Sequence, residues 1–410
     1  MATVEIDTER LWSSLEELGD IGEQPNGSMM RITGSDADKH ARDRVVEWFE
    51  AADLEVSVDA VGNIYGRRSG TYDTAPVLSG SHLDTVPNGG KFDGTTGVLT
   101  AIEVIRAWND AGIETERPIE VVVFTEEEGT RFGTGMLGSQ VGAGVIGVDE
   151  ALAYEDDNGN TLEDVLDAIG YRGTTARDLS EIEAFVEVHV EQGPLLEATD
   201  TTIGVVEAIT GLAHYNVNFT GEANHAGTTA MDLRFDGFAG VAEVSMALEA
   251  KAHELAATSE AVGTIGKVEV DPGAANVIPG VARFTLDIRD TNETHREVLK
   301  HYILGELTAI AERRGLDYDV EEYLDVSATP LDTRVVNTIE EAAKSVGVDY
   351  RRMPSGAAHD AMSVATVAPA GMLFVPSEGG ISHSPAEFTT KDDLSAGTAA
   401  LERALYNLAT

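Results

Sequence analysis

The stretch from Pro76 to Phe124 decides the fold of this chain. It opens with the apolar run Pro76-Val77-Leu78-Ser79, continues through a helical segment from Gly97 to Ala111, and ends with Ile119-Glu120-Val121-Val122-Val123-Phe124. Two apolar runs of strand length on either side of a helical segment are typical of strands in a parallel sheet joined by a crossover helix. The sequence therefore predicts an α/β fold with a mixed, mostly parallel sheet covered by helices on both faces.

Segments before and after this stretch continue the pattern. Asp7 is the predicted N-cap of a first amphipathic helix, with Leu11, Leu15 and Leu18 along one stripe. We expect helices at residues 7–20, 37–52, 331–346 and 394–409, and strands at 54–58 and 63–66. A length of 410 residues exceeds one ordinary core, so two domains are expected.

A different order of elements begins near Leu212. The run Tyr215-Asn216-Val217-Asn218-Phe219 alternates between apolar and polar residues, as a half-buried strand does. After it we expect a helix at 237–255, strands at 262–270 and 281–288, a helix at 293–314 and a strand at 317–323. The order β-α-β-β-α-β is that of a ferredoxin-like sandwich. The sequence thus predicts an inserted α+β domain at residues 212–326, within a catalytic domain formed by residues 1–211 and 327–410.

The net charge of the chain bears on the solvent to which the protein is adapted and not on any reaction that it catalyses. There are 72 acidic residues against 28 basic ones, which gives a formal net charge of −44. Such a surface repels nucleic acid and anionic membranes, and concentrated salt screens its self-repulsion. The composition resembles that of proteins from salt-accumulating organisms, and an acidic enzyme of an ordinary organism is the alternative.

Cysteine usage and the amino terminus bear on the compartment. The chain has no cysteine, which excludes disulfides, thiolate metal ligands and a cysteine nucleophile. The start, Met1-Ala2-Thr3-Val4-Glu5, has neither a basic region nor an apolar run, so we expect no signal peptide. The apolar stretches are also too short to span a membrane. A cytoplasmic location is expected.

Five side chains suited to metal binding lie in short, glycine-punctuated segments that follow apolar runs. They are His82, Asp93, Glu128, His189 and His383. Three imidazoles and two carboxylates suit borderline divalent metals. A spare glutamate beside a ligand glutamate offers a base for water. Folds of this class place their active sites at the carboxyl ends of the strands, so the pattern indicates a metal-dependent hydrolase.

Each of these residues also has an ordinary explanation. His82 and His189 are explained as buried structural histidines, and Asp93 as a turn former in a glycine-rich loop. The run Glu126-Glu127-Glu128 is explained as a solvated acidic surface. However, three carboxylates at the end of an apolar strand repel one another, and a divalent cation relieves this. Asp84 is expected to orient His82 from two residues away.

The motifs around these residues resemble those of the M20 metallopeptidase-type amidohydrolases. The branch concerned holds N-carbamoyl-L-amino-acid hydrolases, β-ureidopropionases and allantoate amidohydrolases. Gly80-Ser81-His82-Leu83-Asp84-Thr85 and Glu127-Glu128-Gly129 resemble the wider family. The segments that resemble the branch are Val188–Pro194, Asn224–Thr229, Asn276–Pro279, Asp287–Arg289, Gly356–Ala361 and Ser382–Glu387. The resemblance covers nearly the whole chain.

The resemblance implies a two-metal site in the catalytic domain. Asp93 would bridge the metals, with His82, Glu128, His189 and His383 as the other ligands. Glu127 would be the general base that takes a proton from water and passes it to the leaving nitrogen. Zn²⁺ fits this donor set best, and Mn²⁺, Co²⁺ or Ni²⁺ also fit.

The resemblance also implies a set of groups that bind the substrate. Arg289 would hold a carboxylate through paired hydrogen bonds, and Gln192 and Asn276 would bind a ureido group or carboxylate. His225 would stabilise the oxyanion, from its own subunit or from the partner in a homodimer formed by the inserted lid domain. For His359 both a substrate contact and a supporting role stay open.

The predicted reaction is hydrolysis of an N-carbamoyl-L-amino acid to the amino acid, CO₂ and ammonia. Allantoate hydrolysis is the alternative, because allantoate also presents a carboxylate and ureido groups; an aminoacylase or dipeptidase is a less favoured reading. Two departures bear on the substrate. Ala230 stands where the branch usually has proline, and Ala358 where relatives often have glycine. Both positions flank the predicted pocket.

Overall fold

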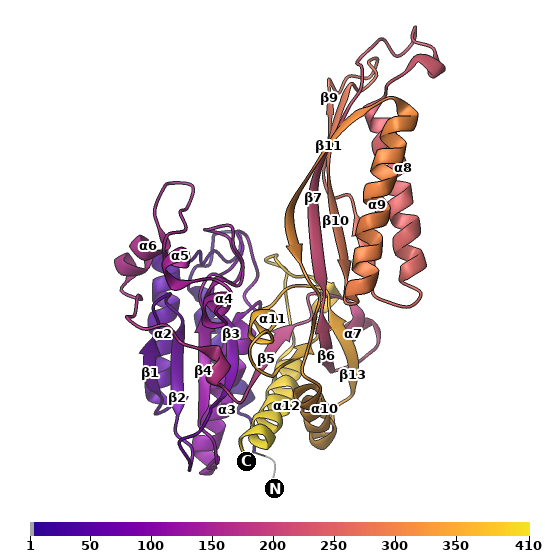
Figure 1. The fold of residues 1–410 in the computed structure, drawn as a ribbon. Coiled ribbons are helices and arrows are strands. Elements are labelled where there is room, and N and C mark those ends of the chain that lie inside the picture. The colour runs from indigo at the N-terminus through magenta and orange to yellow at the C-terminus, as the bar shows by residue number, and fades with distance from the viewer. Residues whose placement is uncertain (1–3) are drawn as a thin grey trace. The chain divides into compact units, whose positions relative to one another are not determined.

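The computed structural model describes residues 4–410, which form two compact units. Unit 1 contains the residues up to Glu207 together with Leu331–Thr410, and unit 2 contains Ala208–Pro330. Unit 2 is therefore an insertion in the chain of unit 1, drawn from magenta to orange in Figure 1. The expectation that there is no signal peptide rests on the amino-terminal residues. Of these, Met1–Thr3 lie outside the described residues.

Unit 1 is built on a mixed sheet, which confirms the predicted fold class. The strands in spatial order are β1 (Glu55–Val58), β2 (Ile64–Arg68), β4 (Ile119–Phe124), β3 (Val77–His82), β5 (Ala184–Val190), β14 (Ala370–Val375), β6 (Ile203–Ile209) and β12 (Thr329–Pro330), and β13 (Tyr350–Ser355) pairs with β6. The four central strands, from β4 to β14, are parallel, and antiparallel strands flank them on both sides. β3, β4, β5 and β14 are buried along their whole length, as both-face burial of a parallel strand requires.

Helices cover both faces of this sheet. In β5, Glu187 accepts a hydrogen bond from the backbone of α11 (Asp360–Val364), whereas the next residue, Val188, faces α12 (Lys391–Ala409). Because successive side chains of a strand point to opposite faces, these two helices lie on opposite sides. The other helices of unit 1 are α1 (Thr8–Asp20), α2 (Asp36–Ala51), α3 (Thr95–Ala111), α4 (Leu137–Gly142), α5 (Val148–Leu152), α6 (Leu162–Ile169), α7 (Leu195–Ala198) and α10 (Thr333–Val346).

Capping side chains set where several helices begin. Asp7 accepts a hydrogen bond from the backbone N–H of Arg10, so the predicted cap of α1 is confirmed. The helix predicted from residue 331 begins at Thr333, because Asp332 caps it. The helix predicted from residue 394 begins earlier, at Lys391, because Thr390 caps it. Both shifts arise because the capping residue, and not the first apolar residue, sets the start of the helix.

Unit 2 is an antiparallel sheet with two helices on one face. Its order along the chain is β7 (Gly211–Thr220), α8 (Gly237–Leu255), β8 (Val262–Thr264), β9 (Val268–Asp271), β10 (Val281–Asp290), α9 (Glu293–Arg314) and β11 (Asp317–Val326). Figure 1 shows α8 and α9 side by side against the sheet. Phe219, Phe284, Leu286 and Ile303 are among the buried residues between the two layers.

The strand predicted at residues 262–270 is wrong as a single element. β8 and β9 both pair with β10, but three residues, 265–267, stand opposite two residues of β10 between the paired stretches. One extra residue on one strand is a bulge. The backbone of Lys267 bonds Thr285 at this point, so the interruption is fixed in place. The strand predicted at 317–323 also continues to Val326.

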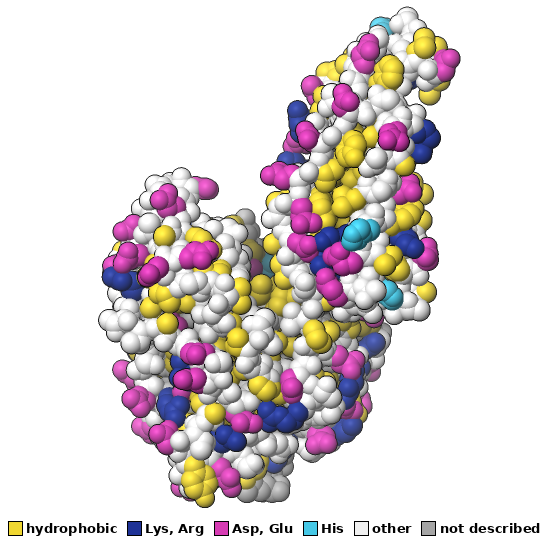
Figure 2. Space-filling model, in the orientation of Figure 1, with side chains coloured by type: hydrophobic (Ala, Val, Ile, Leu, Met, Phe, Trp, Pro, Cys, Tyr) yellow, Lys and Arg dark blue, Asp and Glu magenta, His cyan; other side chains and the backbone are white. Residues whose placement is uncertain are grey.

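The surface carries the acidic excess of the sequence. Figure 2 shows Asp and Glu side chains spread over the visible face of both units, with fewer Lys and Arg between them. Within residues 4–410, no helix combines the length and apolar character needed to cross a bilayer.

Candidate active site

The candidate site of unit 1 is assembled at the carboxyl ends of neighbouring parallel strands. His82 is the last residue of β3, and His189 lies one residue before the end of β5. The acidic run Glu126–Glu128 comes just after β4. Loops that contain Asp93 and His383 reach the same edge of the sheet. The five predicted metal ligands are thus brought together from segments spread over three hundred residues.

Two histidines share one oxygen of Asp93. The Nε2 atom of His189 lies 3.1 Å from Asp93 Oδ1, and the Nε2 atom of His82 lies 3.4 Å from the same oxygen. One ligand atom from each of the three residues lies within 4.8 Å of the others, and all three residues are buried. A buried N,N,O triad of this size matches the donor set of a divalent metal position.

The other oxygen of Asp93 faces a second group. Asp93 Oδ2 lies 3.4 Å from the Nε2 atom of His383, which in turn lies 3.6 Å from Glu128 Oε2. These three residues form the second possible metal-binding group among the described residues. A carboxylate whose two oxygens face separate ligand groups has the placement of a bridge between two metal ions.

Backbone carbonyls fix the orientation of both buried histidines. The Nδ1 atom of His82 lies 3.0 Å from the carbonyl oxygen of Asp84, and that of His189 lies 2.9 Å from the carbonyl oxygen of Val190. A carbonyl only accepts hydrogen bonds, so each Nδ1 carries the proton and each Nε2 presents its lone pair to Asp93. The N–H of Gly94 donates to His189 Nε2, which agrees with this tautomer.

The electrostatics of the site favour a cation. Burial would raise the pKa of Asp93, but in the metal-free site the positive charge of protonated imidazoles, that of His189 foremost, would hold this pKa well below its usual range. Burial raises the pKa of Glu127 well above its usual range and that of Glu128 to about 7. Buried carboxylates that resist ionisation are stabilised in their charged form by a bound divalent cation. The donor set and its charge therefore fit a metal centre.

The contacts of the Asp84 side chain differ from the predicted contact with the His82 ring. Its backbone carbonyl, not its carboxylate, takes the hydrogen bond of His82; the carboxylate oxygen lies 3.6 Å from that ring. The carboxylate instead accepts the backbone N–H groups of Glu127 and Glu128 at 3.2 and 3.1 Å. Asp84 therefore holds the acidic loop in place. The reason is the turn after β4, which points two N–H groups at this carboxylate.

Glu126 and Glu127 lie in different environments. Glu126 has a left-handed backbone with φ of 56°, and its Oε1 atom accepts the backbone N–H groups of Arg131 and Phe132. Its carboxylate is thus used to hold a loop. Glu127 Oε2 lies 3.5 Å from His82 Nε2, at the metal-ligand cluster. Of the two, only Glu127 is placed to act on a reactant there.

Gln192 and His359 both adjoin the cluster. Gln192 has φ of 57°, and its Nε2 donates to Asp93 Oδ2 at 2.7 Å, while its buried Oε1 has no partner among the described residues. His359 is buried with its ring 4.4 Å from that of His189, and its Nε2 lies 3.0 Å from Ser355 Oγ. Burial, and then the neighbouring His189, lower its pKa well below the usual range. His359 is thus a neutral side chain packed behind a predicted ligand.

Three predicted substrate-binding residues lie in unit 2. The His225 Nδ1 atom accepts the backbone N–H groups of Gly227 and Thr228, so its outward Nε2 carries the proton. Asn276 is near this segment, because its carbonyl oxygen accepts the N–H of Ala226. Arg289, close to the end of β10, is held by paired hydrogen bonds to the carboxylate of Asp287. The structure thus places these groups in the inserted unit and the metal-ligand cluster in unit 1.

Two buried glutamates near the cluster, Glu187 and Glu387, are not among the functional residues that the sequence predicts. Glu187, inside β5, accepts a hydrogen bond from Ser81 Oγ and another from the N–H of Ala361. Glu387 accepts the backbone N–H groups of Phe92 and Asp93. A charged residue within the apolar run Phe185–Val190 is a signal that could have identified Glu187. The signal for Glu387 was its place at the end of the segment Ser382–Glu387, which resembles the branch.

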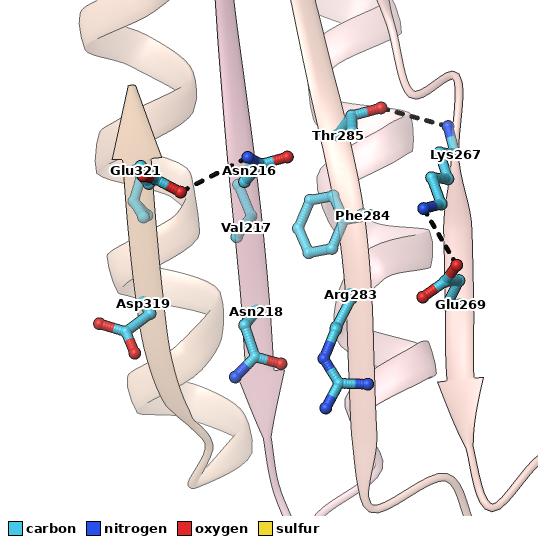
Figure 3. A pocket seen from close by; sticks show the side chains of 11 residues that line it. Asn216, Val217, Asn218, Lys267, Glu269, Arg283, Phe284, Thr285, Asp319 and Glu321 are labelled. Atoms are coloured by element: carbon cyan, nitrogen blue, oxygen red, sulfur yellow. Dashed lines mark hydrogen bonds and ion pairs between the residues drawn. The ribbon is translucent and has the colours of Figure 1, made fainter. Parts of the chain in front are cut away.

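A concave surface of unit 2 is separate from these residues. It has a volume of about 360 Å³ and lies on the sheet face formed by β7, β9, β10 and β11. Figure 3 shows that Arg283, Asn218 and Asp319 lie in one row across the strands, with Asn216 and Glu321 in the next. None of the predicted site residues lines this surface, so we assign it no part in the chemistry.

Comparison with known proteins adds the family context. Residues 78–407 match the family model described as Peptidase family M20/M25/M40. The chain is 40% identical over 409 residues to the N-carbamoyl-L-amino acid amidohydrolase of Geobacillus stearothermophilus, covering 98% of this chain and 99% of that one. It is 37% identical over 402 residues to the allantoate amidohydrolase of Escherichia coli K12, covering 97% of each.

Solved structures give the same result for the fold. The amidase of the hydantoinase/carbamoylase family from Burkholderia multivorans superposes with a TM-score of 0.97 at 40% identity, covering 99% of this chain and 98% of that one. The aminopeptidase PepT of Bacillus cereus superposes with a TM-score of 0.68 at 17% identity, covering 99% of this chain and 100% of that one, and shares the fold alone. The resemblance drawn from the motifs thus extends over the whole chain.

Proposed function

The chain belongs to peptidase family M20/M25/M40, and we propose that it hydrolyses the ureido group of an N-carbamoyl-L-amino acid to give the L-amino acid, CO₂ and ammonia. The relatives that match along its full length include N-carbamoyl-L-amino-acid and allantoate amidohydrolases. The chain is accordingly a hydrolase of carbon–nitrogen bonds in non-peptide amides. The proposal goes beyond this activity in naming the substrate and the metal ions.

One observation carries the proposal: Asp93 lies between two groups of possible ligands, one on each of its oxygens. His82 and His189 would complete one ion's coordination, and Glu128 and His383 the other's. Zn²⁺ suits this nitrogen and oxygen set, as do Mn²⁺, Co²⁺ and Ni²⁺. The bound cations would supply Lewis acidity to the substrate carbonyl and acidify the attacking water.

Glu127 would perform the proton transfers. Its carboxylate lies beside His82, and burial raises its pKa well above the usual range, which makes it a stronger proton acceptor than an exposed glutamate. Glu127 takes one proton from the water as the new carbon–oxygen bond forms. It then passes this proton to the substrate nitrogen as the carbon–nitrogen bond breaks, which releases the amino acid and carbamic acid. The carbamic acid decomposes to CO₂ and ammonia.

The substrate's polar groups match the side chains predicted to bind them. Arg289 presents a guanidinium that Asp287 orients, and a planar fork of this kind binds a carboxylate through two hydrogen bonds. The outward N–H of His225 is suited to the oxyanion of the tetrahedral intermediate. Asn276 and Gln192 would bind the ureido group, the latter through its free Oε1.

The inserted unit would also form a homodimer. Helix α8 has exposed apolar side chains on its outer side, among them Phe238 and Met246, which is 65% exposed. Apolar groups gathered on one helix face are typical of a protein–protein contact. Light scattering on the purified protein tests the dimer, and a Met246→Glu variant that stays dimeric would place the contact elsewhere.

A panel of substrates tests the proposed reaction. Allantoate hydrolysis is the second candidate, because an allantoate amidohydrolase matches the chain at 37% identity and allantoate has both a carboxylate and ureido groups. We expect turnover of N-carbamoyl-L-amino acids, measured by ammonia release, in preference to allantoate, measured in the same way, and to N-acyl amino acids and dipeptides, measured by release of the free amino acid. Turnover of allantoate alone would select the second candidate, and turnover of dipeptides alone would contradict both.

A further inference from the structure

We propose that Glu387 is a positioning residue of the metal centre, which connects the loop of Asp93 to the loop of His383 and so sets the distance between the two ligand groups. The inference rests on the proposed metal positions. It concerns a side chain that binds no metal and makes no contact with a reacting atom.

The carboxylate of Glu387 joins two loops that are almost three hundred residues apart in sequence. Its Oε2 atom accepts the backbone N–H groups of Phe92 and Asp93 at 2.9 and 3.1 Å. Its Oε1 atom accepts the hydroxyl of Ser382 at 2.8 Å. One carboxylate therefore holds the backbone of the bridging Asp93 and the residue directly before His383.

Ser382 makes the connection to Asp93 closer still. Its Oγ atom lies 2.8 Å from Glu387 Oε1 and 3.1 Å from Asp93 Oδ2. A hydroxyl has a single proton, so it donates to one of these oxygens at a time. Gln192 Nε2 also donates to Asp93 Oδ2, and a bound ion would compete for the same oxygen, so Glu387 Oε1 is the less contested acceptor for this proton. Glu387 thereby fixes which way Ser382 turns.

The segment that contains Glu387 is anchored by aromatic packing. The next residue, Phe388, lies with its ring 5.7 Å from that of Phe92, edge to face, and Trp12 lies 6.1 Å from both rings. Glu387 itself is 4% exposed. A buried carboxylate with three donors and a fixed backbone has little freedom to move, which is what the support of a metal ligand requires.

Gly90 shows how tightly the carboxylate is enclosed. A Cβ atom added at this position would lie 2.1 Å from Glu387 Oε2 and 2.5 Å from Glu387 Cβ. Gly90→Ala must therefore displace the Glu387 side chain while leaving its charge in the protein. The variant therefore tests the effect of moving the carboxylate, whereas Glu387→Ala tests the effect of removing it.

The test measures metal binding rather than turnover. Zn²⁺ affinity is measured by competition with a chelating indicator, and the visible absorption of bound Co²⁺ reports the ligand geometry. Outer partners of metal ligands typically contribute about 10- to 100-fold in affinity. We expect Glu387→Ala, Glu387→Gln and Gly90→Ala to lower the affinity by this factor. The ion on the His383 side should be lost first, because Glu387 holds Ser382, the residue directly before His383.

A second buried glutamate of unit 1 provides the control. Glu402 is 2% exposed and accepts the indole N–H of Trp108 at 2.7 Å, with no contact to the cluster. Glu402→Ala and Glu402→Gln should lower the melting temperature yet bind Zn²⁺ and Co²⁺ as the wild type does. If Glu387→Ala does not fold, Ser382→Ala and Glu387→Gln carry the same comparison.

The outcomes are distinct. Wild-type affinity for both ions and an unchanged Co²⁺ spectrum in folded Glu387 variants would overturn the role of Glu387 and leave the proposed function intact. An equal loss in the Glu402 variants would also overturn it, because the effect would then be general destabilisation. If the wild-type protein binds neither ion, the proposed metal centre fails together with this inference.

Discussion

The two units place their polar groups in opposite ways. In unit 1, His82 and His189 are buried at strand ends, Asp93 is buried in a loop beside them, and all three are held by further buried partners. In unit 2, His225 is exposed and Arg289 is partly exposed; one lies in a loop and the other near the end of a strand. Fixed, desolvated groups suit a metal centre and the proton transfers beside it, whereas accessible groups suit the capture of a substrate. The difference suggests chemistry in unit 1 and recognition in unit 2.

Metal removal should have the largest effect, and only on unit 1. Chelation should abolish turnover and lower the melting temperature of unit 1. All three tryptophans, Trp12, Trp48 and Trp108, belong to unit 1, so their fluorescence follows that unit alone. Loss of turnover without a shift in the tryptophan transition would show that metal contributes nothing to the stability of unit 1.

The stabilisation by metal should depend on pH. The pKa of Glu128 is raised from its ordinary 4.5 to about 7 by burial. In the metal-free protein this favours the folded state below the ordinary pKa, and the contribution is lost as pH rises through about 7. The gap in melting temperature between loaded and metal-free protein should therefore be wider at pH 8 than at pH 5.5. A constant gap would contradict this.

Replacing Glu127, the proposed general base, should lower the rate of turnover and leave the fold of unit 1 intact. Glu127→Gln should lower kcat by about 10² to 10⁴-fold, because the amide cannot take the proton from water. Metal content and the tryptophan transition should stay as in the wild type, since Glu127 is not a proposed ligand. Near-normal turnover in a metal-loaded variant would move the base to another residue.

A change in unit 2 should affect recognition alone. Arg289→Lys keeps the charge but loses the planar fork. Loss of a charged hydrogen bond of roughly 2–4 kcal/mol corresponds to about 30- to 1,000-fold in kcat/KM for a carboxylate substrate. Wild type should prefer an N-carbamoyl amino acid over its carboxamide analogue, and the variant should lose most of this preference. An intact preference would assign the carboxylate to another group.

Added salt should have the smallest effect of these changes, and it should raise the unfolding temperature of both units alike. The formal charge of −44 is spread over both, so screening should raise the unfolding temperature of each between low and molar KCl. Tryptophan fluorescence reports unit 1, and hydrogen exchange of α8 and α9 reports unit 2. A transition that is flat with salt would contradict adaptation to concentrated salt.

Local patterns were sufficient for most of the elements. The apolar run at residues 119–124 and the helical stripe after Asp7 lie where they were predicted. The break between β8 and β9 was missed, because a bulge depends on the register of the partner strand and not on the residues of the bulged strand alone. Pairing register is a non-local property.

The site shows the same limit. The five side chains that the sequence predicts as ligands lie together because the segments that contain them follow apolar runs, and parallel strands end at a common edge. The contacts of Asp84 and Glu387 could not be found this way. The first depends on how the backbone turns after Glu126, and the second on two loops 295 residues apart in sequence. A carboxylate that accepts backbone N–H groups from a distant loop leaves no local pattern in the sequence, unlike the cap of a helix such as Asp7.

The place of β14 has a consequence for biosynthesis. This strand lies between β5 and β6 in the sheet, yet the ribosome makes it only after the whole of unit 2. Domains generally fold as they emerge, so unit 2 can fold while the sheet of unit 1 still lacks a central strand. Until then β5 and β6 each expose the edge that β14 later covers, and an unpaired edge is a template for pairing with other chains. His383 follows β14, so the ligand set is complete only after this strand has been made.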